Sequence, residues 1–89
     1  MRAVVIYREN SEYARDVETL MRDLERRTGK VLEVIDPDRK ENEIFLSAHD
    51  VVEYPTVMAL SDDGKILDEW RGRLPRVDEV SYYARERGM

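Results

Sequence analysis

The sequence predicts a single α/β domain in the order strand, helix, strand, helix, β-hairpin, helix. Three patterns predict this fold class. Ala3–Tyr7 is a continuous apolar, β-branched run, typical of a strand buried on both faces. Residues 11–30 then change to helical spacing, and residues 56–70 hold two strand-like runs around an Asp-Gly turn. A chain of 89 residues has room for one core, so residues 1–89 are interpreted as one domain.

The first helix is predicted to begin at Ser11, where the apolar spacing changes. Asn10 or Ser11 is expected to cap its start, and Gly29 is expected to stand just past its end. Charged residues fill the face opposite the apolar one, as in an amphipathic surface helix. The apolar face is expected to comprise Tyr13, Val17, Leu20, Met21 and Leu24.

Val31–Ile35 is expected to form the second strand, which the Asp-Pro-Asp step after it would end. A strand, a helix and a strand in so short a stretch make a βαβ unit, so the two strands are predicted to be parallel. A second helix is expected over residues 41–49, with Ile44, Phe45 and Ala48 on its inner face.

Thr56–Leu60 and Lys65–Trp70 flank a turn rich in aspartate and glycine, which is a β-hairpin signature. Trp70 is expected to be half-buried near the end of the last strand. Gly72 breaks the strand pattern. Residues 77–84 then place apolar side chains at helical spacing and predict a final amphipathic helix.

Composition excludes several classes of function. The 20 acidic and 15 basic residues are interleaved and give a net charge of −5, so no nucleic-acid partner is expected. The chain has no cysteine, which excludes disulfides, thiolate metal sites and thiol nucleophiles. The apolar run at the N-terminus is too short for a signal segment or a membrane span. No membrane partner is therefore expected, and the expected location is cytoplasmic.

No metal or cofactor is expected. The acidic residues after the second strand do not follow the spacing of a calcium loop, because a lysine occupies the third ligand position and no glycine follows. The single histidine, His49, has no second histidine or cysteine with which to share a metal ion. The acidic residues are expected instead to cap and open the second helix; they are Asp36, Asp38, Glu41 and Glu43.

The segment Val52–Leu60, followed by Asp63-Gly64-Lys65 and then by Gly72, resembles the cis-proline strand, hairpin and glycine of thioredoxins. Together with the order of the elements, it resembles the thioredoxin-like superfamily, in the form found in glutaredoxins, over essentially the whole chain. The resemblance implies a βαβαββα fold. Its four-stranded mixed sheet would have the order 2-1-3-4 with strand 3 antiparallel, flanked by three helices. It also implies a cis peptide bond before Pro55.

In those families a Cys-x-x-Cys lies between the first strand and the first helix. That slot reads Ser11-Glu12-Tyr13-Ala14 here, so Ser11 and Ala14 stand where the two sulfurs would be. A serine hydroxyl stays protonated without an adjacent base, so the chain is expected to be redox-inactive and not an enzyme. A thiol oxidoreductase would become the favoured interpretation only if Ser11 replaced a native cysteine.

The resemblance implies that the residue before the cis-proline presents its backbone to an extended peptide or to glutathione. We therefore expect a binding rim, and the leading hypothesis is a protein-interaction module, monomeric, whose protein or peptide partner the sequence does not identify. The KaiB clock-protein family, which is cysteine-free and binds proteins, is similar in general layout. The rim comprises Ser11, Glu12, Tyr13, Ala14, Tyr54, Pro55 and Thr56.

The alternative hypothesis is a glutaredoxin-derived domain that binds glutathione or another small ligand. Tyr13 and Tyr54-Pro55 favour it, and Arg8 would be placed to hold a ligand carboxylate. Glutaredoxins hold glutathione with a Gly-Gly or Gly-Asp step after the hairpin. Gly72-Arg73 departs from that step, which counts against this hypothesis.

Overall fold

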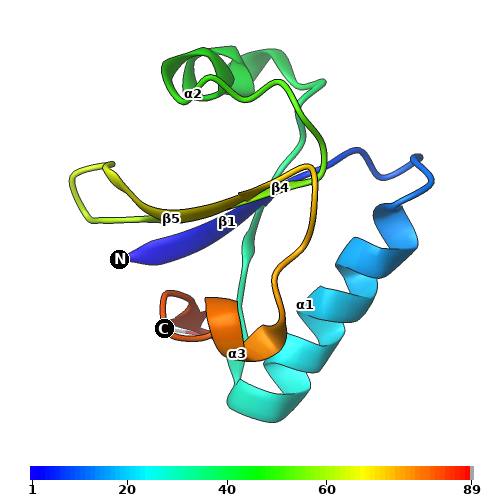
Figure 1. Cartoon of the computed structure of the whole chain (residues 1–89), viewed down its shortest axis with the longest axis vertical. Helices are drawn as coiled ribbons and strands as arrows, with labels where there is room; N and C mark the ends of the chain where they lie inside the picture. The colour runs from blue at the N-terminus through cyan, green and yellow to red at the C-terminus, as the bar shows by residue number, and fades with distance from the viewer. Residues whose placement is uncertain (89) are drawn as a thin grey trace.

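The computed structural model describes residues 1–88, and a four-stranded sheet forms its centre (Figure 1). The sheet contains β1 (Arg2–Ile6), β3 (Glu33–Ile35), β4 (Thr56–Leu60) and β5 (Ile66–Arg71) in the order β3-β1-β4-β5. β1 and β3 are parallel, whereas β4 is antiparallel to both of its neighbours. The predicted strand order and the antiparallel third strand are therefore confirmed.

Helices cover both faces of the sheet. α1 (Ala14–Thr28) and α3 (Val77–Val80) lie on one face, and α2 (Glu43–Ala48) lies on the other (Figure 1). A short 3₁₀ turn, η1 (Lys40–Asn42), leads directly into α2. The central strands β1 and β4 are buried on both faces because each face has its own layer of helix.

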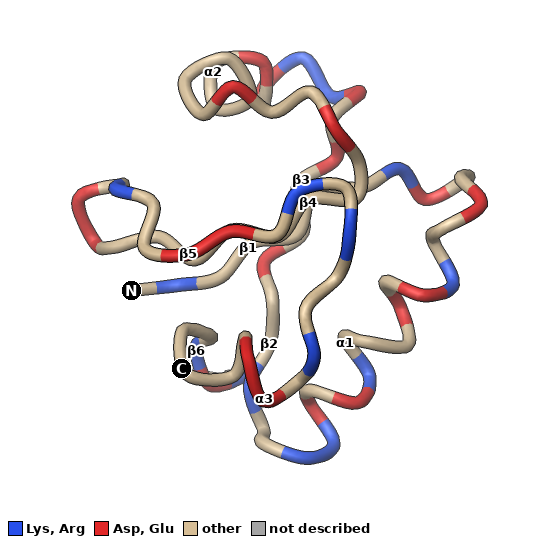
Figure 2. Tube along the Cα trace, viewed as in Figure 1, with Lys and Arg blue, Asp and Glu red and all other residues tan. Residues whose placement is uncertain are grey.

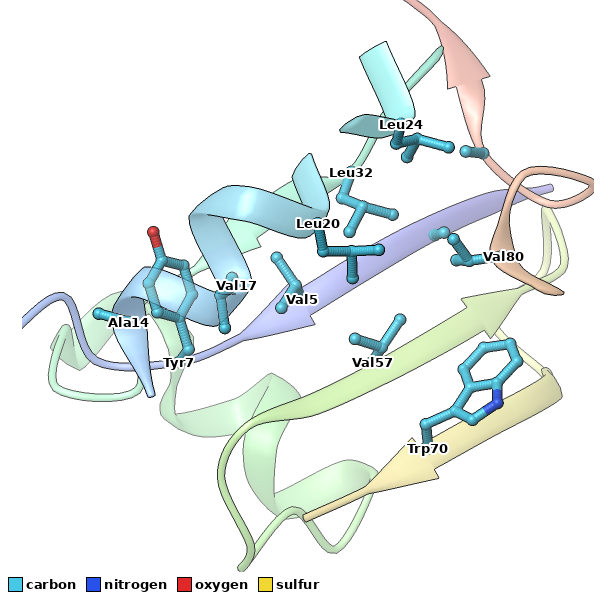
Figure 3. Packing of buried hydrophobic residues seen from close by; sticks show 12 residues of the cluster. Val5, Tyr7, Ala14, Val17, Leu20, Leu24, Leu32, Val57, Trp70 and Val80 are labelled. Carbon is cyan, nitrogen blue, oxygen red and sulfur yellow. The ribbon is translucent and has the colours of Figure 1, made fainter. Parts of the chain in front are cut away.

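The core is split by the sheet into two clusters. Alternate residues of β1 and β4 point to opposite faces, so Val5 and Val57 join one cluster while Val4 and Met58 join the other. Figure 3 shows the cluster on the α1 face, where α1 lays its apolar side chains across the sheet. The labelled residues of that cluster are Val5, Tyr7, Ala14, Val17, Leu20, Leu24, Leu32, Val57, Trp70 and Val80.

The end of the first helix is as predicted, but its start is not. Gly29 takes a left-handed conformation with a φ of 74°, and its amide donates to the carbonyl of Glu25 at 2.8 Å. The helix begins at Ala14 and not at Ser11, and neither Asn10 nor Ser11 caps it. The Ser11 hydroxyl bonds back to the loop, and the Ser11 carbonyl accepts the Ala14 amide in a turn that precedes the helix.

The second strand is divided in two. β2 (Lys30–Val31) and β3 are separated by Leu32, whose side chain turns into the core and is 6% exposed. β2 pairs with a C-terminal strand that the sequence did not predict, β6 (Arg85–Glu86). Because the chain turns into β6, the last helix ends at Val80 and does not include the predicted residues 83 and 84.

The face that α2 turns to the sheet differs from the predicted one. Phe45 and Leu46 pack against the core, but Ile44 is 84% exposed and Ala48 is also exposed. The helix is only six residues long, so one turn decides which residues face inward; the prediction is correct for Phe45 and wrong for Ile44 and Ala48. Trp70 is more buried than predicted, at 3% exposed, because it packs under α3 with Val80 and Ala84.

Charged residues are interleaved along the helices and loops (Figure 2). No helix within residues 1–88 combines the length and the apolar composition needed to cross a bilayer.

We expect Leu24→Ala to lower the free energy of unfolding by about 2–5 kcal/mol, because it leaves a cavity in a fully buried position of the α1-face cluster. Leu67→Ala is the matched control, since Leu67 is 47% exposed and its truncation should change that free energy by at most about 0.5 kcal/mol. Urea unfolding of the two variants and the wild type makes the comparison. Equal losses would contradict the described core.

Candidate functional site

The pairing of β1 with β4 brings the two loops that carry the predicted rim residues to the same end of the sheet. Ile6, the last residue of β1, lies opposite Thr56, the first residue of β4. The loop that leaves β1 toward α1 and the loop that enters β4 therefore meet at the same end of the sheet. The first loop carries Ser11 to Ala14, and the second carries Tyr54 and Pro55.

Arg8 joins the two loops. Its Nε lies 3.0 Å from each carboxylate oxygen of Asp38, and its guanidinium carbon lies 4.7 Å from the centre of the Tyr54 ring. The second distance is that of a cation–π contact. The hydrogen bond to Asp38 raises the pKa of Arg8 above its ordinary value, and the Tyr54 and Tyr13 phenols contribute less. Arg8 therefore stays charged and holds Asp38 and Tyr54 at the site.

The energy of the Arg8–Asp38 ion pair is small. The two side chains are 39% and 60% exposed, and exposed pairs contribute about 0.2–1 kcal/mol. The pair therefore determines local geometry more than it determines global stability. It connects the segment after β3 with the segment after β1, so three loops meet at this end of the sheet.

Residues 11–14, which the sequence predicted to correspond to a Cys-x-x-Cys slot, make contacts within the protein. The Ser11 hydroxyl donates to the carbonyl of Arg8 at 2.5 Å. Ala14 is 6% exposed and belongs to the core cluster on the α1 face, while Glu12 is exposed. A hydroxyl that donates to a carbonyl keeps its proton and has no base to activate it.

His49 lies at the end of α2 and is engaged there. Its Nδ1 is 2.9 Å from the carbonyl of Phe45, and its Nε2 is 3.5 Å from the carbonyl of Gly64 in the hairpin turn. The imidazole also stacks on the Phe45 ring with centroids 4.3 Å apart. These contacts join α2 to the hairpin and give His49 a structural role.

The loop before β4 is held by hydrogen bonds on both sides of Tyr54. The Tyr54–Pro55 peptide bond is cis. The Thr56 hydroxyl donates to the carbonyl of Glu53 at 2.7 Å, and the Gly72 amide donates to the carbonyl of Pro55 at 2.9 Å. No hydrogen bond within residues 1–88 reaches the amide or the carbonyl of Tyr54. That peptide edge is available to another chain.

Gly72 supports this loop from the neighbouring strand. It has a φ of 71°, where a side chain is strained, and an added Cβ would come 2.9 Å from the carboxylate of Glu53. The glycine that the sequence singled out therefore takes a positive φ that a side chain would strain, and in this conformation its amide donates to Pro55.

The two rim tyrosines face different sides of the sheet. Tyr13 is half-buried against the core cluster on the α1 face, whereas Tyr54 packs against the cluster on the α2 face. They do not form the single flat surface that two tyrosines on one rim would offer. Of the two, Tyr54 carries the contact with Arg8.

Asp38 is the residue of the site that the sequence interpretation missed. It was expected to cap the second helix, but it binds Arg8, and its amide donates to the side chain of Asp36 at 2.9 Å. The signal was present in the topology, because Arg8 and Asp38 each follow the carboxyl end of one of two adjacent parallel strands. Within residues 1–88, no three histidine or acidic side chains gather as metal ligands.

Among solved structures, thioredoxin 1 from the thermophilic eubacterium Thermosipho africanus TCF52B is similar to this chain, with a TM-score of 0.65 and 18% sequence identity. The match covers 93% of this chain and 89% of that one. This chain has a thioredoxin-like fold. No family model matches it, and no curated protein matches it. At this identity the likeness shows the fold alone, so the function must be argued from the site.

We expect the double variant Ser11→Cys/Ala14→Cys to oxidise to an intramolecular disulfide. The Ala14 amide bonds to the Ser11 carbonyl at 3.3 Å, and such a turn brings the two Cα atoms within about 7 Å, the limit for a disulfide. A free-thiol assay before and after oxidation measures the bond, and each single variant is the control. A folded double variant that keeps both thiols would show that these positions do not correspond to the thioredoxin slot.

Proposed function

We propose that this thioredoxin-like chain is a redox-inactive protein-interaction module that binds an extended segment of a protein partner along the backbone of Tyr54. The observation that carries the proposal is the Tyr54 peptide edge, where amide and carbonyl have no partner within residues 1–88. An extended segment can pair with such an edge through main-chain hydrogen bonds, as in β-augmentation.

The fixed surroundings of Tyr54 favour binding at this position. The carbonyl of Pro55 and the hydroxyl of Thr56 are both hydrogen-bonded, which holds the backbone next to Tyr54 in place before a segment binds. The Tyr54 ring is held by Arg8. A preorganised edge loses less conformational freedom on binding than a mobile loop does.

The chain's chemistry supports a role without redox or enzymatic activity. There is no cysteine to exchange disulfides. The serine that occupies the first slot donates to a backbone carbonyl, and the only histidine is bound at the far end of α2. These observations favour a role in which the Tyr54 edge binds a protein segment.

The structure offers less support for glutathione binding. Arg8, which would hold a ligand carboxylate, already faces the carboxylate of Asp38. A second carboxylate would have to share that guanidinium with Asp38 and would be repelled by it. We therefore do not propose this alternative.

The test is a capture experiment from the native cells with wild type, Pro55→Ala and Tyr82→Ala. Pro55→Ala should alter the Tyr54 edge and lose the captured partner, whereas Tyr82→Ala should keep it, because Tyr82 is 69% exposed on the distant C-terminal segment. Circular dichroism checks that Pro55→Ala folds. A folded variant that keeps every partner would exclude this edge as the binding surface.

If Pro55→Ala does not fold, amide chemical shifts of the wild type decide the matter. Addition of the captured partner should move the resonances around Tyr54, and movement confined to other surfaces would contradict the proposal. Glutathione at millimolar concentration should leave the same resonances unmoved. Shifts centred on Tyr54 and Thr56 would favour the small-ligand alternative.

A further inference from the structure

The two most exposed large apolar side chains among residues 1–88 lie on α2 and in the segment that follows it. Ile44 is 84% exposed at the start of α2, and Val52 is 79% exposed just after its end. Single exposed apolar residues are ordinary on a protein surface. These two differ because each lines one of two adjoining shallow hollows beside α2.

Two shallow hollows of about 410 Å³ each adjoin on this face. Ile44 lines one hollow and Val52 lines the other, and both hollows are bordered by Glu43 and Ser47, so they lie side by side on this part of the surface. We name this surface the α2 groove and define it by Glu43, Ile44, Ser47, Asp50 and Val52. Leu46, Ala48 and Val51 add apolar surface to these hollows, so a segment long enough to span both would bury Ile44 and Val52.

The side chains that line the α2 groove carry charge of one sign. Glu43 and Asp50 line it, and neither hollow is lined by a lysine or arginine. Arg71 lies near but is engaged, because it donates to the carbonyls of His49 and Asp50 and to the carboxylate of Glu69. Figure 2 shows acidic residues at the start of α2 and in the segment that leaves it, and basic residues in the segment that leads into α2.

We propose that the α2 groove docks a basic amphipathic segment of a protein partner. The apolar side chains of that segment would cover Ile44 and Val52, and its lysine or arginine side chains would face Glu43 and Asp50. Charge complementarity is what selects this occupant. A second copy of this chain, with a net charge of −5, would bring like charges together, and an anionic membrane or a nucleic acid would be repelled.

The α2 groove is distinct from the Tyr54 edge in residues and in chemistry. Val52 lies only two residues before Tyr54, so one partner can engage both surfaces, but the groove binds through side chains whereas Tyr54 binds through backbone. The two proposals can therefore fail independently.

The probe is a synthetic helical peptide of leucine and lysine, titrated into the isotope-labelled protein while amide chemical shifts are recorded. We expect shifts centred on Ile44, Ser47 and Val52. The same peptide with glutamate in place of lysine should not bind. Absence of binding by the lysine peptide, or shifts centred on any other surface, would overturn the proposal.

Paired variants separate the apolar and the charged contributions. Ile44→Ser/Val52→Thr should raise the Kd at least about tenfold, because it removes the apolar contact. Glu43→Gln/Asp50→Asn should raise it at least about threefold. Asparagine suits position 50, where φ is 52°, so this pair removes charge with little strain.

Matched controls exclude a general attraction to an acidic protein. Asp16→Asn/Glu18→Gln removes two exposed charges on α1 and should leave the Kd unchanged. An equal loss from that pair would overturn the proposal, as would concentration-dependent shifts at Ile44 and Val52 without peptide, which would place a second copy in the groove. Tyr82→Ala, a change on the C-terminal segment away from both surfaces, should also leave the Kd unchanged.

Discussion

The antiparallel pairing of β1 with β4 is the constraint on which the site depends. Five residue pairs run from Arg2 opposite Leu60 to Ile6 opposite Thr56, and both strands are buried under helices on each face. Because both strands are apolar on both faces, burial holds them at the centre of the sheet, and the observed register decides which loops meet at its end. Because Ile6 lies opposite Thr56, Arg8 in the loop after β1 comes into contact with the ring of Tyr54 in the loop before β4.

At the same end of the sheet, hydrogen bonds, an ion pair and a cation–π contact connect the loops of this cysteine-free chain. Ser11 bonds to the carbonyl of Arg8, and Arg8 extends to Asp38 and Tyr54. Each bond is individually weak because the groups are partly exposed. Together these bonds hold the β1–α1 loop in place and leave the backbone of Tyr54 without a partner among residues 1–88. For this reason we propose a binding function and not a catalytic one.

The sequence predicted the elements with strong patterns and failed where tertiary contacts decide. The buried run of β1, the βαβ order and Gly29 all follow from local periodicity and backbone preference. The facing of α2 could not be predicted, because six residues carry too little periodicity, and β6 forms only by pairing with β2. In the site, Arg8 was expected to face a ligand carboxylate, and its actual partner could not be predicted because Asp38 is 30 residues away in sequence.

Backbone hydrogen exchange at Tyr54 tests the central claim most directly. In the free protein we expect the Tyr54 amide to exchange fast, since no acceptor within residues 1–88 binds it, while the amide of Val57 at the centre of the sheet is protected. With the captured partner bound, the Tyr54 amide should become protected. Protection of Tyr54 in the free protein, to the degree seen for Val57, would contradict the claim that this edge is open to a partner.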